Sequence, residues 1–114
     1  MDVSSLISLC HTRSKQAGWW PENPSIETYA TKIALIHSEV SEMLEGLRKG
    51  EADKHLINYS AEHVEAADVF IRLADYCGAR GINLERLVMK KLMYNARRED
   101  HKLKARAADG GKKI

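Results

Sequence analysis

Cysteine and proline are scarce in this chain of 114 residues, which holds two of each and seven glycines. Cys10 and Cys77 are too few to build a disulfide framework or a cysteine-rich zinc site. Proline breaks a helix interior because it lacks the N–H donor and clashes with the preceding turn. Its rarity therefore favours long helices over a sheet of many short strands.

Long apolar runs are also missing. No stretch approaches the roughly 18 apolar residues that a membrane-spanning helix needs. The first residues, MDVSSLISLCHTRSK, lack a long apolar core and soon become charged, which is not the pattern of a signal peptide. We therefore expect a cytoplasmic protein with no membrane partner.

The net charge of +2 hides an uneven distribution. From Lys90 to the C-terminus there are nine Lys/Arg against three acids, a balance of +6, and the rest of the chain carries nine against thirteen, a balance of −4. A basic end can bind nucleic acid, or it can bind the phosphates of a small nucleotide. Composition alone does not choose between these partners.

The hydrophobic pattern predicts four helices, at about residues 4–16, 26–49, 61–79 and 84–105. Ser25, Ser60 and Asn83 stand where the N-caps of the last three helices are expected, and Gly50 stands at the end of the second. Between the first two helices, Gly18-Trp19-Trp20-Pro21-Glu22-Asn23-Pro24 reads as a loop because proline and glycine interrupt it.

We expect these helices to form an all-α, four-helix bundle-like protomer, with one domain over residues 1–108 and a flexible tail at 109–114. In the second helix, apolar residues at 3-4-3-4 spacing predict the packing seam Ile33, Ile36, Val40, Met43 and Leu47. In the fourth helix, the residues expected to face inward are Leu84, Leu87, Val88, Leu92 and Leu103. The helices are more apolar than one small bundle can bury, which predicts a dimer or a larger assembly.

Two pairs of acids flank the predicted seams. Glu39 and Glu42 are three residues apart in the second helix, and Glu65 and Asp68 are three apart in the third. Residues at this spacing are neighbours on one helix face, and two helices with a short connection pack antiparallel. The four carboxylates can therefore face one another and bind Mg²⁺, or Mn²⁺ in its place, since both ions prefer oxygen ligands.

Other interpretations of the acids remain open. Either pair alone is more often a solvated helix face than a metal site, and Glu45 lies nearly opposite the seam, which makes it a weaker candidate. A ferritin-like di-iron bundle needs Glu-x-x-His on two helices, and no histidine here stands three residues after a glutamate.

The spacing Glu39-x-x-Glu42, then Glu65-x-x-Asp68, resembles the metal motif of the MazG-like, all-α nucleoside triphosphate pyrophosphohydrolases. The surrounding segments KIALIHSEVSEMLEGLRKGE, DVFIRLADYC and KKLMYNARR are similar too. The resemblance covers about residues 18–100. It implies a protomer of the MazG type in a homodimer or homotetramer, four acids that bind Mg²⁺, and cleavage of a nucleoside triphosphate to the monophosphate and pyrophosphate. It favours a dNTP substrate.

The resemblance also implies roles outside the four acids. Lys91 and Asn95, one turn apart on the last helix, would contact the nucleotide, and Trp19 or Trp20 would help to enclose its base. A solvated basic face and ordinary core packing are the respective alternatives. Arg98 belongs to the same basic face and is a further candidate for substrate binding.

Within this mechanism, Glu42 is the expected proton acceptor, and Lys91 would stabilise charge on the departing pyrophosphate. Arg72 departs from the pattern, because some pyrimidine-specific relatives carry an aromatic residue there. It leaves the base preference open and could instead bind a phosphate or a carboxylate.

Two other functions remain possible. A non-catalytic helical interaction protein, such as a nucleic-acid-binding dimer, could use the basic C-terminal region, although only Tyr94 there is aromatic and we expect no nucleic-acid partner. A phosphoribosyl-ATP pyrophosphohydrolase shares the helical scaffold and chemistry, but the tryptophan loop and the EAADVFIRL segment fit the MazG-like dNTP branch better.

Overall fold

The computed structural model describes residues 1–114, which form two compact units, residues 1–82 and residues 83–114. The first unit contains α1 (Val3–Gln16), α2 (Ile26–Lys49) and α3 (Ala61–Arg80). The second contains α4 (Leu84–Arg97), the 3₁₀ helix η1 (Glu99–His101) and α5 (Leu103–Ala107). There is no strand beyond one isolated bridge, so the all-α class is confirmed. The single domain over residues 1–108 stays a prediction.

The predicted caps begin the helices as expected. Ser25, Ser60 and Asn83 each accept a hydrogen bond from the backbone N–H three residues later. Gly50 and Gly81 end α2 and α3 in the left-handed conformation, with φ of 66° and 65°. Glycine adopts this conformation without the steric cost that other residues incur.

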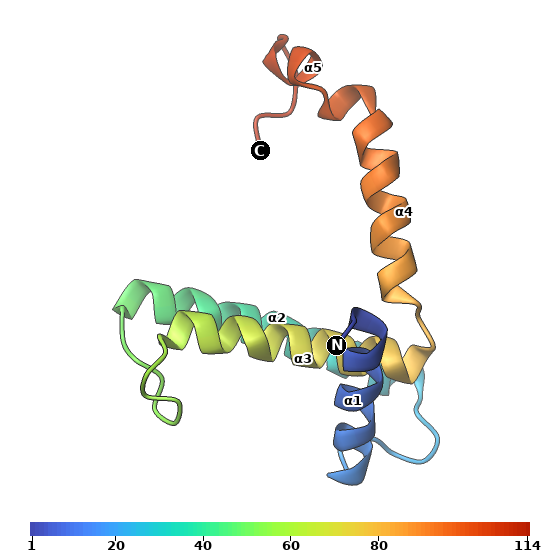
Figure 1. Cartoon of the computed structure of the whole chain (residues 1–114), viewed down its shortest axis with the longest axis vertical. Helices are drawn as coiled ribbons and strands as arrows, with labels where there is room; N and C mark the ends of the chain where they lie inside the picture. Colours follow the sequence, from blue (N-terminus) through green and yellow to red (C-terminus); the bar gives the residue numbers. More distant parts are fainter. The chain divides into compact units, whose positions relative to one another are not determined.

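In the first unit, α2 and α3 lie side by side, and α1 crosses the C-terminal half of α3 (Figure 1). Both contacts depend on glycine. A Cβ on Gly46 of α2 would lie 2.7 Å from the backbone nitrogen of Glu62, and a Cβ on Gly78 of α3 would lie 2.6 Å from the Cβ of His11. The helices therefore meet at distances that only a residue without a side chain allows.

The face by which α2 packs on α3 differs from the predicted seam. Ile36 and Met43 are half-buried as predicted, but the other three predicted seam residues, Ile33, Val40 and Leu47, are exposed. Six of the less exposed positions of α2 form a line on the neighbouring side of the helix. They are Tyr29, Lys32, Ile36, Glu39, Met43 and Gly46. The close approach at Gly46 and the ion pair of Glu39 with α3 select this line.

The connection from α2 to α3 is a closed loop. Asp53 and Tyr59 are joined by a backbone hydrogen bond, as are Glu51 and Ala61. The Asp53 carboxylate accepts hydrogen bonds from the backbone N–H groups of His55 and Leu56, at 2.9 and 2.7 Å. These bonds hold the loop against the ends of the two helices that carry the acids.

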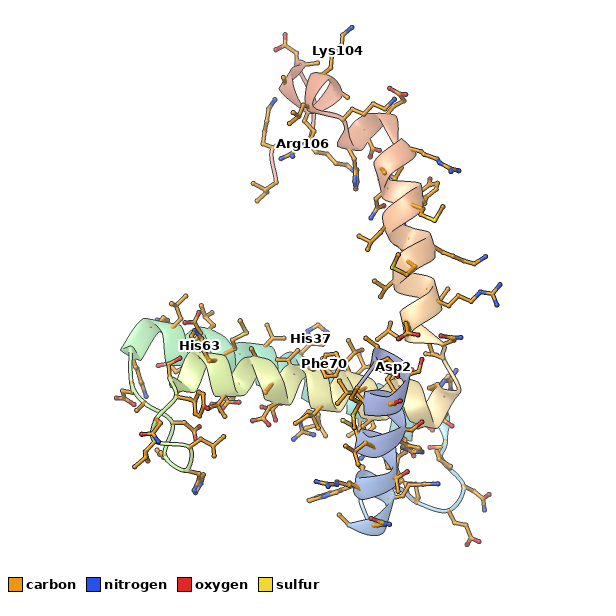
Figure 2. All side chains as sticks on the ribbon, viewed as in Figure 1. Asp2, His37, His63, Phe70, Lys104 and Arg106 are labelled. Carbon is orange, nitrogen blue, oxygen red and sulfur yellow. The ribbon has the colours of Figure 1, made fainter.

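In the second unit the fourth helix ends at Arg97, not near residue 105. Arg98 has extended backbone angles, and its side chain turns to bind the Asp100 carboxylate through two nitrogens, at 3.0 and 2.7 Å. Asp and His are weak helix formers, which favours a break at Glu99-Asp100-His101. Side chains stand out along α4 (Figure 2). Four of the residues predicted to face inward, Leu87, Val88, Leu92 and Leu103, are exposed.

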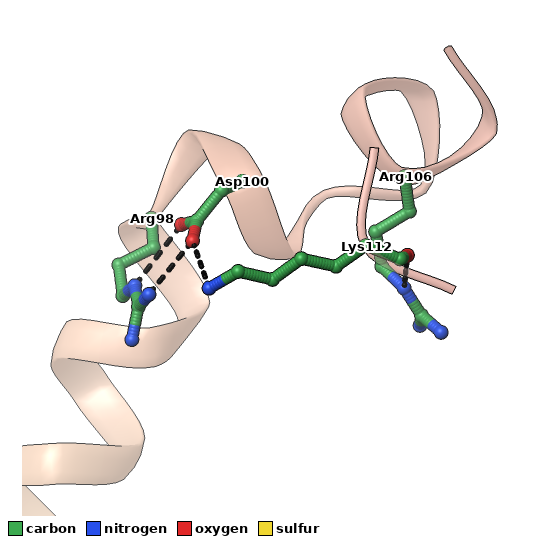
Figure 3. A network of polar contacts seen from close by, with 4 residues as sticks. All are labelled: Arg98, Asp100, Arg106 and Lys112. Carbon is green, nitrogen blue, oxygen red and sulfur yellow. Dashed lines mark hydrogen bonds and ion pairs between the residues drawn. The ribbon is translucent and has the colours of Figure 1, made fainter. Parts of the chain in front are cut away.

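The C-terminal tail folds back on α5 (Figure 3). Lys112 binds Asp100 at 2.8 Å, the Arg106 guanidinium donates to the carbonyl oxygens of Lys112 and Lys113, and the Lys113 ammonium donates to those of Arg106 and Ala108. Several cations of the basic region are thus already engaged. No helix of the chain combines the length and the apolar character that crossing a bilayer requires.

Candidate metal centre

Three of the four predicted acids come together between α2 and α3. Glu39, Glu65 and Asp68 each offer a carboxylate oxygen, and these oxygens lie within 4.8 Å of one another. All three residues are half-buried. The antiparallel packing of the two helices brings Glu39 of α2 beside the pair Glu65 and Asp68 of α3.

The electrostatics of the cluster favour a cation. Burial, followed by a hydrogen bond to Glu39 and the negative charges of Asp68, Glu39 and Glu42, raises the pKa of Glu65 to about 7. A carboxyl group holds its proton at this pH only where neighbouring charge and desolvation disfavour the anion. A divalent cation would relieve the same repulsion, and oxygen-only ligands suit Mg²⁺ or Mn²⁺.

Glu42 lies beside the cluster but outside the group of three. It is an exposed residue that lines a pocket of about 340 Å³ together with Glu65. Its charge still reaches Glu65, whose pKa it helps to raise. Glu45, the weaker candidate, forms exposed ion pairs with Arg48 at 3.0 Å and Lys49 at 3.7 Å.

The pocket also contains basic residues that sequence reasoning missed. Lys49, at the end of α2, and Lys54 and His55, in the closed loop, line it together with the acids. The sequence places Lys54 and His55 in a polar connection with no periodicity. The loop closure by Asp53 brings these two side chains beside Glu42 and Glu65.

Arg72 belongs to the cluster as a partner of one acid. Its Nε lies 2.7 Å from Oε1 of Glu39, and the Glu39 side chain is 16% exposed. The residue lies one turn beyond Asp68 on the same strip of α3. Its guanidinium therefore neutralises part of the negative charge between the helices.

The two adjacent tryptophans have different surroundings. Trp20 is half-buried, and its indole N–H donates to Oδ1 of Asp75 at 2.8 Å. The side chain of Trp19 is exposed. Trp20 packs within the first unit, and Trp19 faces solvent.

The remaining predicted residues lie on α4 and at its end, in the second unit. The Lys91 ammonium lies 4.9 Å from the centre of the Tyr94 ring, and Arg98 is paired with Asp100. The Asn95 side-chain oxygen is buried and has no hydrogen-bond partner. A buried acceptor without a donor costs free energy, so this oxygen is a place where a bound group could donate.

The chain matches no model of a known protein family, no characterised protein and no solved structure.

Proposed function

We propose that this chain is a Mg²⁺-dependent nucleoside triphosphate pyrophosphohydrolase of the MazG-like kind. It would cleave a nucleoside triphosphate, with a dNTP preferred over an NTP, to the monophosphate and pyrophosphate. The observation that carries the proposal is the cluster of Glu39, Glu65 and Asp68, with oxygens within 4.8 Å and a pKa of about 7 at Glu65.

The cluster suits Mg²⁺, with Mn²⁺ able to substitute. Glu39, Glu65 and Asp68 would hold the ion, and Glu42 would join them from the pocket side. When bound, Mg²⁺ supplies charge for phosphate oxygens and lowers the pKa of a coordinated water. Arg72 would offset part of the negative charge of Glu39 through its bond to Oε1.

The other steps are assigned to side chains of this chain. The exposed Glu42 carboxylate would accept the proton of the attacking water. Lys49, Lys54 and His55 line the same pocket and would bind phosphate oxygens that extend beyond the acids.

The family resemblance also implies substrate contacts from residues of α4. Lys91 would stabilise charge on the departing pyrophosphate, and the unpartnered Asn95 oxygen would accept a hydrogen bond from the nucleotide. Arg98 would contribute positive charge, although Asp100 already engages its guanidinium. The roles of Lys91 and Asn95 follow from the family resemblance, and Arg98 is a candidate because it belongs to the same basic face.

The protein would act as a homodimer or homotetramer. Its buried hydrophobic residues are only Ile7, Ala74 and Cys77, whereas α2 alone exposes a stripe that continues over about four turns. The stripe consists of Ile33, Val40, Leu44 and Leu47. Apolar surface of this extent is typical of a face that another protein surface covers.

A second candidate function rests on charge. Residues 83–114 hold ten Lys/Arg and four Asp/Glu, a balance of +6. A non-catalytic dimer that binds nucleic acid through this region would show salt-sensitive binding without Mg²⁺. The ion pairs of Arg98, Lys102 and Lys112 reduce the charge available for such binding.

The proposed activity is tested by measuring pyrophosphate release from the four dNTPs, the four NTPs and dUTP. The full chain is assayed with Mg²⁺, with Mn²⁺ and with excess chelator. We expect metal-dependent release of pyrophosphate, with monophosphate as the other product and dNTPs as the better substrates. Orthophosphate as the product, or no release from any nucleotide, would contradict the proposal. Binding to duplex DNA or RNA in chelator, weakened by salt, would support the second candidate.

A further inference from the structure

The carboxylate of Asp75 connects the loop between α1 and α2 to the helices α1 and α3. Oδ1 of Asp75 accepts the indole N–H of Trp20 at 2.8 Å and lies 2.8 Å from Nδ1 of His11. The side chains of Asp75 and His11 are 14% and 18% exposed. The Trp20 ring also meets His11 edge-on, with ring centres 5.6 Å apart, and Tyr29 at 6.2 Å. Side chains from α1, α2 and α3 therefore surround this indole.

The neighbouring residue is fixed by its backbone alone. The Trp19 N–H donates to the carbonyl oxygen of Ser14, and its own carbonyl oxygen accepts a hydrogen bond from Lys32 at 2.7 Å. The Lys32 ammonium also lies 4.6 Å from the centre of the Trp20 ring. The Trp19 side chain, in contrast, is 69% exposed. The Trp19 backbone is thus fixed at its N–H and at its carbonyl oxygen, while its aromatic ring faces solvent.

This arrangement adjoins the acidic cluster along α3. Glu65, Asp68, Arg72 and Asp75 follow one another at spacings of three, four and three, which keeps them on one strip of the helix. Asp75 lies about 10 Å along the axis from Asp68, at 1.5 Å per residue. The acids and the residue that holds the loop therefore lie on one side of α3.

We propose that Asp75 is a positioning residue that gives the two tryptophans different roles. Through Trp20 and His11 it fixes the loop, so that Trp20 is an anchor and Trp19 is the ring that stacks on a flat aromatic ligand. Holding the backbone in place before binding lowers the entropy that a ligand must overcome. The identification of that ligand as a nucleobase rests on the proposed function.

The anchoring is tested first without any ligand. In a Trp19→Phe background, Trp20 is the only tryptophan, and acrylamide quenching of its selectively excited fluorescence reports its accessibility. Asp75→Ala removes the acceptor and is expected to raise the quenching constant at least twofold. Asp75→Asn keeps an acceptor oxygen and is expected to leave it near the parent value. Glu22→Ala, an exposed acid of the same loop, is the matched control. Equal quenching in the Ala, Asn and parent proteins would overturn the anchoring role.

The stacking role is tested by steady-state kinetics with the best dNTP of the panel. Trp19→Ala is expected to raise KM about tenfold, since base stacking on an aromatic ring contributes on this scale, with kcat within twofold. Trp19→Phe should recover most of the loss. Asp75→Ala should raise KM in the same way, and the KM of Asp75→Asn should lie near the parent value. An unchanged KM in Trp19→Ala, or no difference between the two Asp75 variants, would overturn this part.

Two further measurements keep the outcomes separate. If circular dichroism shows that Asp75→Ala has lost helicity, Trp20→Phe replaces it, because this change removes the N–H donor and keeps an aromatic ring. Time-resolved anisotropy should then show greater rotational freedom of Trp19, and unchanged freedom would count against the anchor. If the parent chain hydrolyses no nucleotide, the proposed function and the nucleobase assignment fail together, while the ligand-free quenching still decides the role of Asp75.

Discussion

The Arg72 guanidinium binds Glu39 across the interface of α2 and α3, with Nε 2.7 Å from Oε1. Glu39 is also one of the three acids whose oxygens converge. The Glu39 carboxylate therefore pairs with the Arg72 guanidinium and also belongs to the group of acids that could hold a metal ion. A metal ion bound there would compete with Arg72 for the negative charge of Glu39.

Arg72→Gln is expected to strengthen Mg²⁺ binding because it returns the full charge of Glu39 to the cluster. The gain should be roughly threefold to tenfold in Kd, the effect of about 1 kcal/mol. Without metal, the variant should unfold at slightly lower temperature, since a partly exposed ion pair contributes up to about 1 kcal/mol. Calorimetric titration with Mg²⁺ in the absence of nucleotide measures the change. Arg48→Gln, which removes an exposed pair with Glu45, is the control. Weaker Mg²⁺ binding in Arg72→Gln would show that Arg72 helps to build the site.

The raised pKa of Glu65 predicts how stability depends on pH in the metal-free protein. Between about pH 4.5 and pH 7 the unfolded chain has released this proton and the folded chain still holds it. The free energy of unfolding should therefore fall as pH rises through this window, because the folded state binds more protons. We expect Glu65 to contribute about 1–2 kcal/mol to the fall, after allowance for solvent screening.

Urea titrations at several pH values between 4.5 and 8, in chelator, measure this dependence. Glu65→Gln should flatten the profile and be more stable than the parent above pH 7. Mg²⁺ should offset the loss in the parent and have little effect in the variant. A parent profile that rises across the window would show that the Glu65 pKa is not raised.

Much of the first unit is predictable from local signals. The bounds of α2 and the N-caps at Ser25 and Ser60 follow from capping residues and periodicity. The two i, i+3 acid pairs also mark three of the residues that converge. What local signals leave open is the face by which α2 meets α3, because its apolar stripe is wider than the contact. Glycine decides the contact at Gly46, and an ion pair decides it at Glu39.

The loops are less predictable for a similar reason. The adjacent residues Trp19 and Trp20 are equivalent in sequence, and only the partner on α3, 55 residues from Trp20, separates them. The break after Arg97 depends on a side-chain bond to Asp100 that competes with helix continuation. Neither effect has a periodic pattern.

Gly46→Ala is expected to destabilise the protein, although alanine is the better helix former by about 1 kcal/mol. The added Cβ would lie 2.7 Å from a backbone nitrogen of α3, and backbone cannot rotate away as a side chain can. Overpacking of this kind costs about 1–3 kcal/mol. Thermal unfolding measures the loss, with Ser41→Ala on the exposed side of α2 as the control. A more stable Gly46→Ala would show that α2 and α3 do not approach so closely.

Removing the acids separates their role in activity from their role in folding. Glu39→Gln and Asp68→Asn keep size and hydrogen bonding but lower the charge of the cluster. Each should reduce Mg²⁺-dependent pyrophosphate release by at least 100-fold, on the order of 3 kcal/mol in the barrier. Helicity by circular dichroism should be unchanged.

The two acid variants should differ in stability without metal. Asp68→Asn should raise the melting temperature because it relieves repulsion with Glu65. Glu39→Gln should not, since the same change weakens the pair with Arg72. Glu27→Gln, which alters an exposed acid on the same helix, should leave activity within twofold of the parent. Full activity in both Glu39→Gln and Asp68→Asn would place the metal site elsewhere, whereas loss in all three variants would point to the net charge of α2 and α3 and not to these ligands.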